Sequence, residues 1–138
     1  MNTADKEMLT LINNAGANAR SCGDKSYAAV GALSWNCSLE NAAKIHSKSM
    51  ADNNYFSHTG SDGSSLGDRM SAAGYNWSTY GENIAAGHAD AKSVMQGWLD
   101  SPGHCSNIMG SEFSEVGVGR AEGRGYGVYW TQDFGTSF

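Results

Sequence analysis

The chain has little proline and few basic residues, and both shortages exclude classes of protein. Only 1 of its 138 residues is proline, so its 18 glycines are expected to make most of the turns. Lysine and arginine number 9 against 14 acidic residues, which gives a net charge of -5. Because the basic side chains form no cluster, we expect neither a nucleic acid nor an anionic membrane surface as a partner.

Long hydrophobic runs are also missing. No apolar stretch approaches the ~20 residues that a membrane-spanning helix requires, so we expect no membrane span. No signal peptide precedes the first helical pattern, which predicts either a cytosolic protein or a chain that starts at a mature N-terminus. Hydrophobic residues make up 40% and charged residues 17%, which is typical of a folded domain. The length predicts a single domain over residues 1–138.

Cysteine is scarce, and its number is odd. Cys22, Cys37 and Cys105 contain no Cys-x-x-Cys pair, which argues against a zinc knuckle or a thioredoxin-like motif. One disulfide with one spare thiol would fit an exported protein, whereas three thiols would fit a cytosolic one. The residues alone leave the pairing open, because Cys22–Cys37 closes a short loop and is geometrically easy.

Hydrophobic periodicity predicts helices in most of the chain and strands near its end. Apolar side chains at spacings of three and four predict a first helix over 3–19. Ser38 is placed to cap a second helix, and the Ser65-x-x-Asp68 spacing of a capping box predicts a short third one through Ala73. A fourth helix is expected over 91–99, and a fifth is expected to start at Pro102 with Ser101 as its N-cap. Strands are expected over 80–87, 116–119 and 126–132. Helices gathered on a small antiparallel sheet predict an α+β fold.

The histidines divide into two pairs. His46 lies on the apolar face of the second helix and is expected to be buried and hydrogen-bonded, whereas His88 lies in a polar loop and is expected to be solvated. His58 and His104 stand beside glycine-containing turns, where side chains often line a cleft. Glu82 lies in an otherwise apolar segment, and a buried carboxylate requires a partner.

Two imidazoles and one carboxylate support several kinds of site. His58, Glu82 and His104 can form a hydrogen-bonded site, three ligands for a divalent metal such as zinc, or a general acid/base pair near neutral pH. Each possibility requires the fold to bring together residues that are far apart in the sequence.

The stretch SPGHC sets His104 beside Cys105, but a thiol–imidazole pair is not expected there. Neighbouring side chains on a helix diverge by roughly 100°, and only spacings of three and four residues meet. A cysteine protease is therefore disfavoured. Because His104 lies near the positive N-terminal end of its helix, its imidazole should tend to stay neutral and able to bind a metal.

Several motifs in order make the chain recognisable. The motifs lie between the first helix and Phe134, and in chain order they are FSHTG, DG, DR, GY, GENIA, W-x-x-SPGH, NIM, VGVG and YWTQ-x-FG. In this the chain resembles the CAP superfamily of cysteine-rich secretory proteins, antigen 5 and pathogenesis-related 1 proteins. The resemblance is greatest to the family's bacterial branch of small SCP-like extracellular domains.

This resemblance implies a fold and a site. The fold would be a three-layer α-β-α sandwich with a small, mainly antiparallel central sheet, in a secreted, monomeric protein. The family's cleft holds a His/Glu/Glu/His tetrad, of which His58, Glu82 and His104 match three members. The second glutamate would fall at Ser101 and is missing, and Asp100 stands one position early.

The resemblance also implies a cofactor and a disulfide. His58, Glu82 and His104 would bind Zn²⁺ or another divalent cation weakly, rather than a tight structural zinc. The Arg20-Ser21-Cys22-Gly23 stretch and SPGHC match relatives that pair these two cysteines, which implies Cys22–Cys105 with Cys37 left over.

Three functions are compatible with these residues. The first two are a module that binds a small ligand, lipid, glycan or protein, and a module that interacts with the cell envelope or a host, and together they are the leading expectation. The alternative is a metal-assisted, protease-like hydrolase in which Glu82 or His104 activates water. In a binding module, aromatic side chains would line a groove, although each of them is individually more typical of core packing: Tyr55, Phe56, Tyr75, Trp77 and Tyr80.

Overall fold

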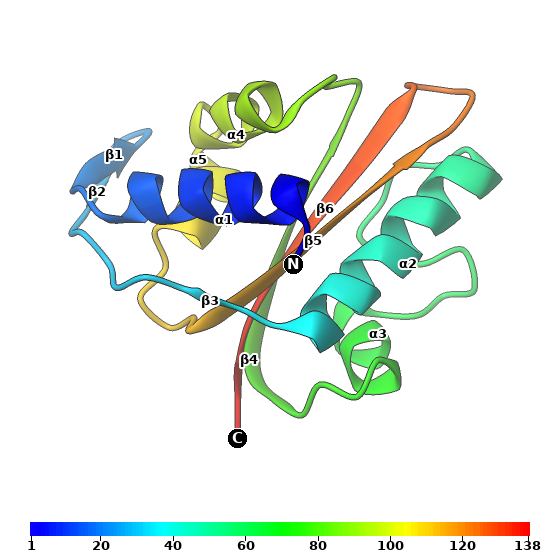
Figure 1. The fold of residues 1–138 in the computed structure, drawn as a ribbon, viewed down its shortest axis with the longest axis horizontal. Helices are drawn as coiled ribbons and strands as arrows, with labels where there is room; N and C mark the ends of the chain where they lie inside the picture. The colour runs from blue at the N-terminus through cyan, green and yellow to red at the C-terminus, as the bar shows by residue number, and fades with distance from the viewer.

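The computed structural model describes all residues 1–138 and contains five helices and six strands (Figure 1). The helices are α1 (Thr3–Gly16), α2 (Cys37–Asn53), α3 (Leu66–Ala72), α4 (Ala91–Leu99) and α5 (Pro102–Ile108). The strands are β1 (Arg20–Cys22), β2 (Lys25–Tyr27), β3 (Ser34–Trp35), β4 (Trp77–Ala86), β5 (Glu115–Glu122) and β6 (Val128–Ser137). None of the helices is both long and apolar enough to cross a membrane.

The central sheet has the strand order β3-β5-β6-β4. β6 pairs antiparallel with both β4 and β5, and only the short β3 joins in parallel. β1 and β2 form a separate small hairpin. In the β4–β6 register Glu82 stands opposite Asp133, and Asn83 opposite Gln132, so polar side chains meet in the middle of the sheet.

Helices cover both faces of this sheet, which confirms the expected three-layer α-β-α sandwich. Figure 1 shows α2 and α3 on one side of the twisted strands, and α1, α4 and α5 on the other. The largest hydrophobic cluster joins α1, α4 and α5 to the sheet through residues such as Trp98, Val116 and Phe134. Two smaller clusters lie under α2, around Leu39 and Met50.

The VGVG motif places α2 against the sheet backbone. A side chain built at Gly117 would meet Glu40 N of α2, and one at Gly119 would meet Lys44 N, both well inside normal contact distance. The two glycines therefore let the helix axis approach β5 more closely than any larger residue would permit.

Two expected helix boundaries were wrong for local reasons. α1 ends at Gly16 rather than residue 19, because Gly16 O accepts a hydrogen bond from Val30 N at 2.7 Å and the returning chain covers this position. Asn36, not Ser38, caps α2 by accepting from Leu39 N. The backbone N–H of Asn36 also bonds Val116 O of β5, which fixes the helix start at the sheet edge.

The other boundaries follow the sequence more closely. α4 has the expected bounds, and Ser65 and Asp68 form the expected reciprocal capping box on α3. Ser101 precedes α5 with Pro102 in its first turn, although the Ser101 side chain makes no capping bond. The three expected strands are present with shifted ends: β4 starts earlier than residue 80, β5 extends at both ends, and β6 starts at Val128 instead of residue 126 and continues to Ser137.

The cysteines pair as the resemblance implied. Cys22 and Cys105 form a disulfide with their Cα atoms 5.5 Å apart, and Cys37 is free and exposed. The rival Cys22–Cys37 pairing is therefore wrong. The disulfide joins the β1–β2 hairpin to α5, next to His104.

Candidate functional site

A buried carboxylate, Glu82 of β4, is the centre of the candidate site. Its side chain is only 1% exposed, and Arg69 of α3 binds it through two hydrogen bonds, Nη1 to Oε2 at 2.8 Å and Nη2 to Oε1 at 3.2 Å. A bidentate guanidinium–carboxylate pair fixes both position and orientation. The partner that a buried Glu82 requires is therefore Arg69.

Glu82 also determines the tautomer of His58. His58 Nδ1 lies 2.9 Å from Glu82 Oε1, and since an ionised carboxylate can only accept, Nδ1 carries the proton. Nε2 is then the free ring nitrogen of a side chain that is 59% exposed. Arg69 additionally donates to the backbone carbonyl of His58, so the loop after α2 is tied to the same group.

Asp133 of β6 adds a second acid to this group. It is fully buried, stands opposite Glu82 in the sheet, and has no donor group in contact with either oxygen. Burial and then the charge of Glu82 raise the pKa of Asp133 well above its usual range. A proton on Asp133 therefore supplies a hydrogen bond that Glu82 accepts.

The resulting carboxylate cluster, His58, Arg69, Glu82 and Asp133, holds one negative charge on Glu82. Burial by itself raises the pKa of Glu82, but the hydrogen bonds from His58, Asp133 and Arg69 outweigh it and lower the pKa to about 2. The two carboxyls thus share one proton, which lies on Asp133.

His104 reaches the neighbourhood of the cluster through a network of amide side chains. Asn83, fully buried next to Glu82, donates to the backbone carbonyl of His104 at 3.1 Å and to Gln132 Oε1 at 2.9 Å. Asn107 of α5 donates to Asn83 Oδ1 and to the backbone carbonyl of Glu82. These bonds hold the first turn of α5 against β4.

The imidazole of His104 is uncommitted. No hydrogen bond joins it to His58 or Glu82, and its buried Nδ1 has no partner in the protein. Burial first, and the charge of His58 second, lower the pKa of His104, which favours the neutral ring expected from the sequence.

The other two histidines differ in how well they were predicted. His46 is 1% exposed and its Nε2 lies 2.7 Å from the carbonyl oxygen of Ser57, which confirms a buried, bonded residue. Burial lowers its pKa. His88 is half-buried rather than solvated, because its ring packs against Gly97 of α4 and its Nδ1 contacts Ser93 Oγ at 2.9 Å.

The missing family glutamate is not replaced by Asp100. Asp100 is exposed at the end of α4, and its carboxylate accepts a hydrogen bond from Gln96 one turn earlier. The second acid of the site is Asp133, which comes from the opposite strand.

The donor set fits a metal only in part. The chain contains no group of three or more His, Cys, Asp and Glu side chains arranged to hold a metal ion. Both oxygens of Glu82 are bonded within the cluster, so in this arrangement Glu82 orients His58 instead of standing free as a ligand. His58 Nε2 and the ring of His104 are the remaining candidate ligands.

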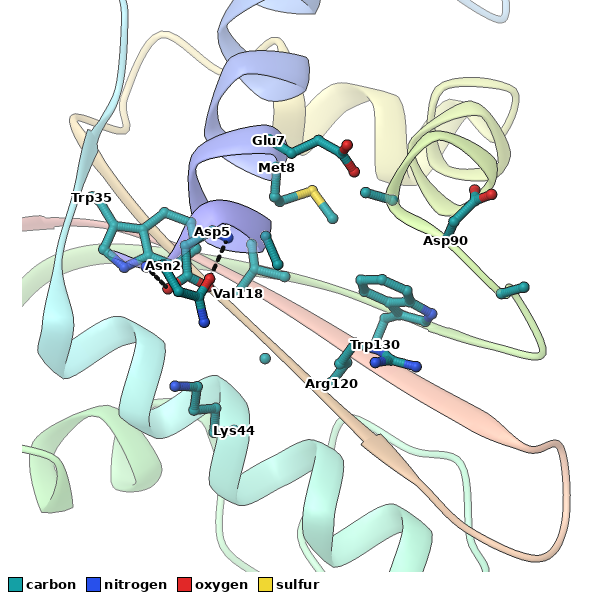
Figure 2. Close-up of a pocket in the computed structure, with 14 residues that line it drawn as sticks. Asn2, Asp5, Glu7, Met8, Trp35, Lys44, Asp90, Val118, Arg120 and Trp130 are labelled. Carbon is teal, nitrogen blue, oxygen red and sulfur yellow. Dashed lines mark hydrogen bonds between the residues drawn. The ribbon is translucent and has the colours of Figure 1, made fainter.

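Five surface pockets lie elsewhere. His58, Glu82 and His104 line none of these five, whose volumes range from about 380 to 680 Å³. One of about 390 Å³ opens between the start of α1, α2, α4 and strands β5 and β6, where Trp130 and Arg120 stack beside Val118 (Figure 2).

The five aromatic residues considered as groove-lining do not line these pockets. Tyr75 is buried, Trp77 and Tyr55 pack against the smaller core clusters, and Phe56 and Tyr80 are exposed. Core packing, which was expected of each aromatic residue individually, therefore describes Tyr55, Tyr75 and Trp77, and none of the five lines a groove among these pockets.

Arg69, Asp133 and the amide network were missed as site residues, although the sequence contained a signal for each. Arg69 belongs to the DR motif and directly follows the capping box of α3. Gln132 and Asp133 are adjacent polar residues between the apolar positions Trp130 and Phe134 of their strand. A buried polar residue in such a strand indicates a partner on the neighbouring strand, which β4 provides.

Comparison with known proteins gives relatives that are longer than this chain. The uncharacterized protein YkwD of Bacillus subtilis (strain 168) is 38% identical over 96 residues, covering 70% of this chain and 36% of that protein. The uncharacterized membrane protein YlbC of the same organism is 35% identical over 102 residues, covering 74% and 28%. This chain therefore spans only about a third of the length of these relatives.

A solved structure agrees with the fold. An extracellular protein containing an SCP domain from Bacillus anthracis str. Ames superposes with a TM-score of 0.79 at 34% identity, covering 97% of this chain and 40% of that one. The family model for the Cysteine-rich secretory protein family, CAP, matches residues 9–134. Together with the order of the motifs and the three-layer fold, this match establishes that the chain belongs to the CAP family.

Proposed function

We propose that the chain is a ligand-binding domain of an exported protein, and that His58 and His104 hold a divalent cation weakly. Export is supported by the solved relative at 34% identity, which is described as extracellular. The Cys22–Cys105 disulfide also agrees with an oxidising compartment, because such bonds are rare in the cytosol.

The observation that carries the cation proposal is the hydrogen bond between His58 Nδ1 and Glu82. Metal-binding histidines usually donate their second ring N–H to a carboxylate, which fixes the ring and raises its basicity. Glu82 is itself held by Arg69, so His58 is oriented before any cation arrives. His104, with its lowered pKa and unpartnered Nδ1, is the second nitrogen ligand.

Binding is better supported than hydrolysis. A general base works best when its pKa is near the ambient pH, and the pKa of Glu82 is lowered to about 2. Its oxygens are also occupied by Arg69 and His58. The hydrogen bonds by which Glu82 holds His58 in place, and the low pKa that they produce, therefore make Glu82 a poor general base for activating water.

A zinc titration by calorimetry tests this proposal. The wild type should bind one Zn²⁺ with a Kd of roughly 0.1–1 mM, since two imidazoles and water make a weak site. His58→Ala and His104→Ala should each weaken binding by about tenfold or more. His88→Ala is the matched control, because His88 is half-buried as His104 is and lies in a loop as His58 does, and it should leave the affinity unchanged.

Two results would contradict the proposal. Equal affinity in the wild type and both histidine variants would place the cation elsewhere. Turnover of an ester or peptide panel that is lost on chelation and in His58→Ala would instead support the hydrolase.

A further inference from the structure

The pocket drawn in Figure 2 has a volume of about 390 Å³, which falls within the range of small-molecule sites. It is lined by the starts of α1 and α4, by α2 and by strands β3, β5 and β6. Neither His58 nor His104 lines it, so it is separate from the proposed cation site. The pocket is called here the α1–β5 pocket, and the lining residues that matter below are Glu7, Met8, Asp90, Val118, Arg120 and Trp130.

The centre of the pocket is apolar. Met8 of α1, Val118 of β5 and Trp130 of β6 line it, and all three belong to the largest hydrophobic cluster. The indole of Trp130 is held in place, because its Nε1–H donates to the backbone carbonyl of His88 at 2.9 Å. A ligand therefore meets a fixed apolar surface against which an apolar side chain can pack.

Acidic side chains line the pocket on the side of α1 and α4 (Figure 2). Glu7 is exposed on α1 and takes part in none of the ion pairs of the chain. Asp90, the N-cap of α4, accepts from Ser93 N through Oδ1 only, which leaves Oδ2 for a ligand. Asp5 is less available, because it is bound in the reciprocal cap of α1 with Asn2. Glu7 and Asp90 are therefore the acids that a positive group would meet.

Basic side chains line the pocket on the side of β5 and α2. The guanidinium of Arg120 stacks over the Trp130 ring, with Cζ 5.4 Å from the ring centroid. Its ion pair with Glu122 is long, at 3.3 Å, and both side chains are exposed, so this pair contributes little. Lys44 is already bound by Glu40 of the same helix. Arg120 is therefore the base that a carboxylate would meet, and its planar guanidinium can bind both oxygens of that group.

Opposite charges around an apolar centre disfavour a ligand of one charge. A ligand with only a negative group would face the carboxylates of Glu7 and Asp90, and one with only a positive group would face Arg120. A neutral ligand would displace water from all three charges without replacing its hydrogen bonds. A ligand with one charge of each sign, joined by an apolar part, can pair with both sides at once.

We propose that the α1–β5 pocket binds a short peptide that has a free amino end and a free carboxyl end. The ammonium group pairs with Glu7 and Asp90, and the carboxylate pairs with Arg120. An apolar side chain of the peptide packs against Met8 and Trp130. A dipeptide separates its two charges by a peptide unit, which suits partners that come from different sides of the pocket, whereas a free amino acid carries both on one carbon.

A titration of the full chain with the dipeptide leucyl-alanine, followed by amide and indole NMR signals, tests the proposal. Saturable shifts are expected at Val118, Gly119 and Trp130, with a Kd of roughly 0.1–5 mM. EDTA is present throughout, so that no cation at His58 and His104 takes part. The peptide site and the cation site can therefore fail independently of each other.

Two modified ligands test each charge separately. N-acetyl-leucyl-alanine lacks the ammonium group, and leucyl-alanine amide lacks the carboxylate. Each should bind about fivefold or more weakly than leucyl-alanine, which is the effect of losing one partly exposed ion pair.

Charge variants assign each end of the peptide to its partner. Glu7→Gln should weaken binding of leucyl-alanine by about threefold or more but should not weaken binding of the N-acetyl peptide, which has no ammonium group to lose. Arg120→Gln should weaken leucyl-alanine to a similar extent but should not weaken the amide. Glu112→Gln and Arg124→Gln are the matched controls, because both residues are exposed outside the pocket, and they should bind as the wild type does.

A blocking variant tests the location. Ala4→Phe places a ring in the pocket from an exposed position of α1 and should weaken leucyl-alanine by about tenfold or more. Thr10→Phe, exposed on the same helix but outside the pocket, should bind as the wild type does.

Three results would overturn the proposal. The first is the absence of a saturable shift up to about 50 mM leucyl-alanine, ten times the weakest expected Kd. The second is equal affinity for leucyl-alanine and both modified peptides, which would mean that the charges are not recognised. The third is wild-type affinity in Ala4→Phe, which would place the peptide elsewhere.

Discussion

At the level of single residues, the protonation of Asp133 controls the charge of the carboxylate cluster. Its side chain is fully buried opposite Glu82, and the pair shares one proton with the negative charge on Glu82. Glu82 can then bind Arg69 and orient His58 at the same time. An ionised Asp133 would put two like charges into the interior beside a single guanidinium.

Asp133→Asn should stabilise the protein at neutral pH. The pKa of Asp133 is raised in the folded state, so above its unfolded pKa of about 4 the wild type loses stability as pH rises, by at most about 1.4 kcal/mol per pH unit. Asparagine keeps the shape and the donor of the neutral acid without this cost. The gain in the free energy of unfolding should therefore be largest near pH 7 and vanish towards about pH 4.

Denaturant unfolding at several pH values measures this gain. Asp100→Asn, at an exposed carboxylate, is the control and should show little change between the same pH values. A destabilised Asp133→Asn protein at every pH would mean that the folded state requires an ionised Asp133.

At the residue scale, the sequence indicated that Glu82 is a buried charge that requires a partner, but it did not indicate which residues are its partners. The Glu82 carboxylate in an apolar segment correctly indicated a paired charge. Neither Arg69 nor Asp133 could be assigned to it, because β6 and α3 reach Glu82 only after the sheet has formed. Pairing across strands depends on register, which the alternation of a single strand does not specify.

At the level of secondary-structure elements, the close approach of α2 to β5 sets the distance between one helical layer and the sheet. Gly119→Ala should lower the free energy of unfolding by about 1–3 kcal/mol, because the added methyl would meet the backbone of Ala43 and Lys44. Chemical denaturation of the purified variant measures the loss.

Gly103→Ala is the matched substitution for Gly119→Ala. Gly103 lies in the first turn of α5, and nothing lies within 4 Å of a side chain built there. The variant should therefore be neutral or slightly stabilised, since alanine favours helix. Equal effects at the two positions would contradict the close packing of α2 on β5.

Element positions were more predictable than their ends. Apolar spacing located α1, α2 and α4, because each of them buries a face, whereas the capping box located α3 and the Ser101-Pro102 pair located α5. The cap of α2 was misplaced because Ser38 and Asn36 are both competent caps, and the choice is made by the bond from Asn36 N to Val116 O. That bond belongs to the sheet, so local pattern could not reveal it.

At the level of the whole molecule, one disulfide links the small hairpin to the helix that carries His104. Replacing both cysteines, as Cys22→Ala with Cys105→Ala, should cost about 4–5 kcal/mol, because the bond spans 83 positions and restricts the unfolded chain. Cys37→Ala should change stability little, since Cys37 is free and exposed.

Thermal and denaturant unfolding under oxidising conditions, and again with a reductant, compare these variants. The reductant should destabilise the wild type and Cys37→Ala but not the double variant. A wild type insensitive to complete reduction would contradict a stabilising role for the disulfide.

The three-layer architecture was predictable at this scale because several separated motifs identified the family together. That neither His58 nor His104 lines any of these five pockets was not predictable, because it depends on how loops and the first turn of α5 pack around the rings. A pocket of about 380 Å³ lined by α2, α3 and the loop between them was likewise hidden, since its lining comes from two helices and a loop.

The central claim is that His58 and His104 together hold a cation while Glu82 orients His58. A crystal structure of the wild type soaked with Zn²⁺ and measured at the zinc absorption edge tests it most directly. The account predicts one anomalous peak within about 2.0–2.1 Å of a nitrogen of each histidine, with Glu82 still bonded to His58 Nδ1. A peak away from these rings, or Glu82 turned from Arg69 to bind the metal itself, would contradict it.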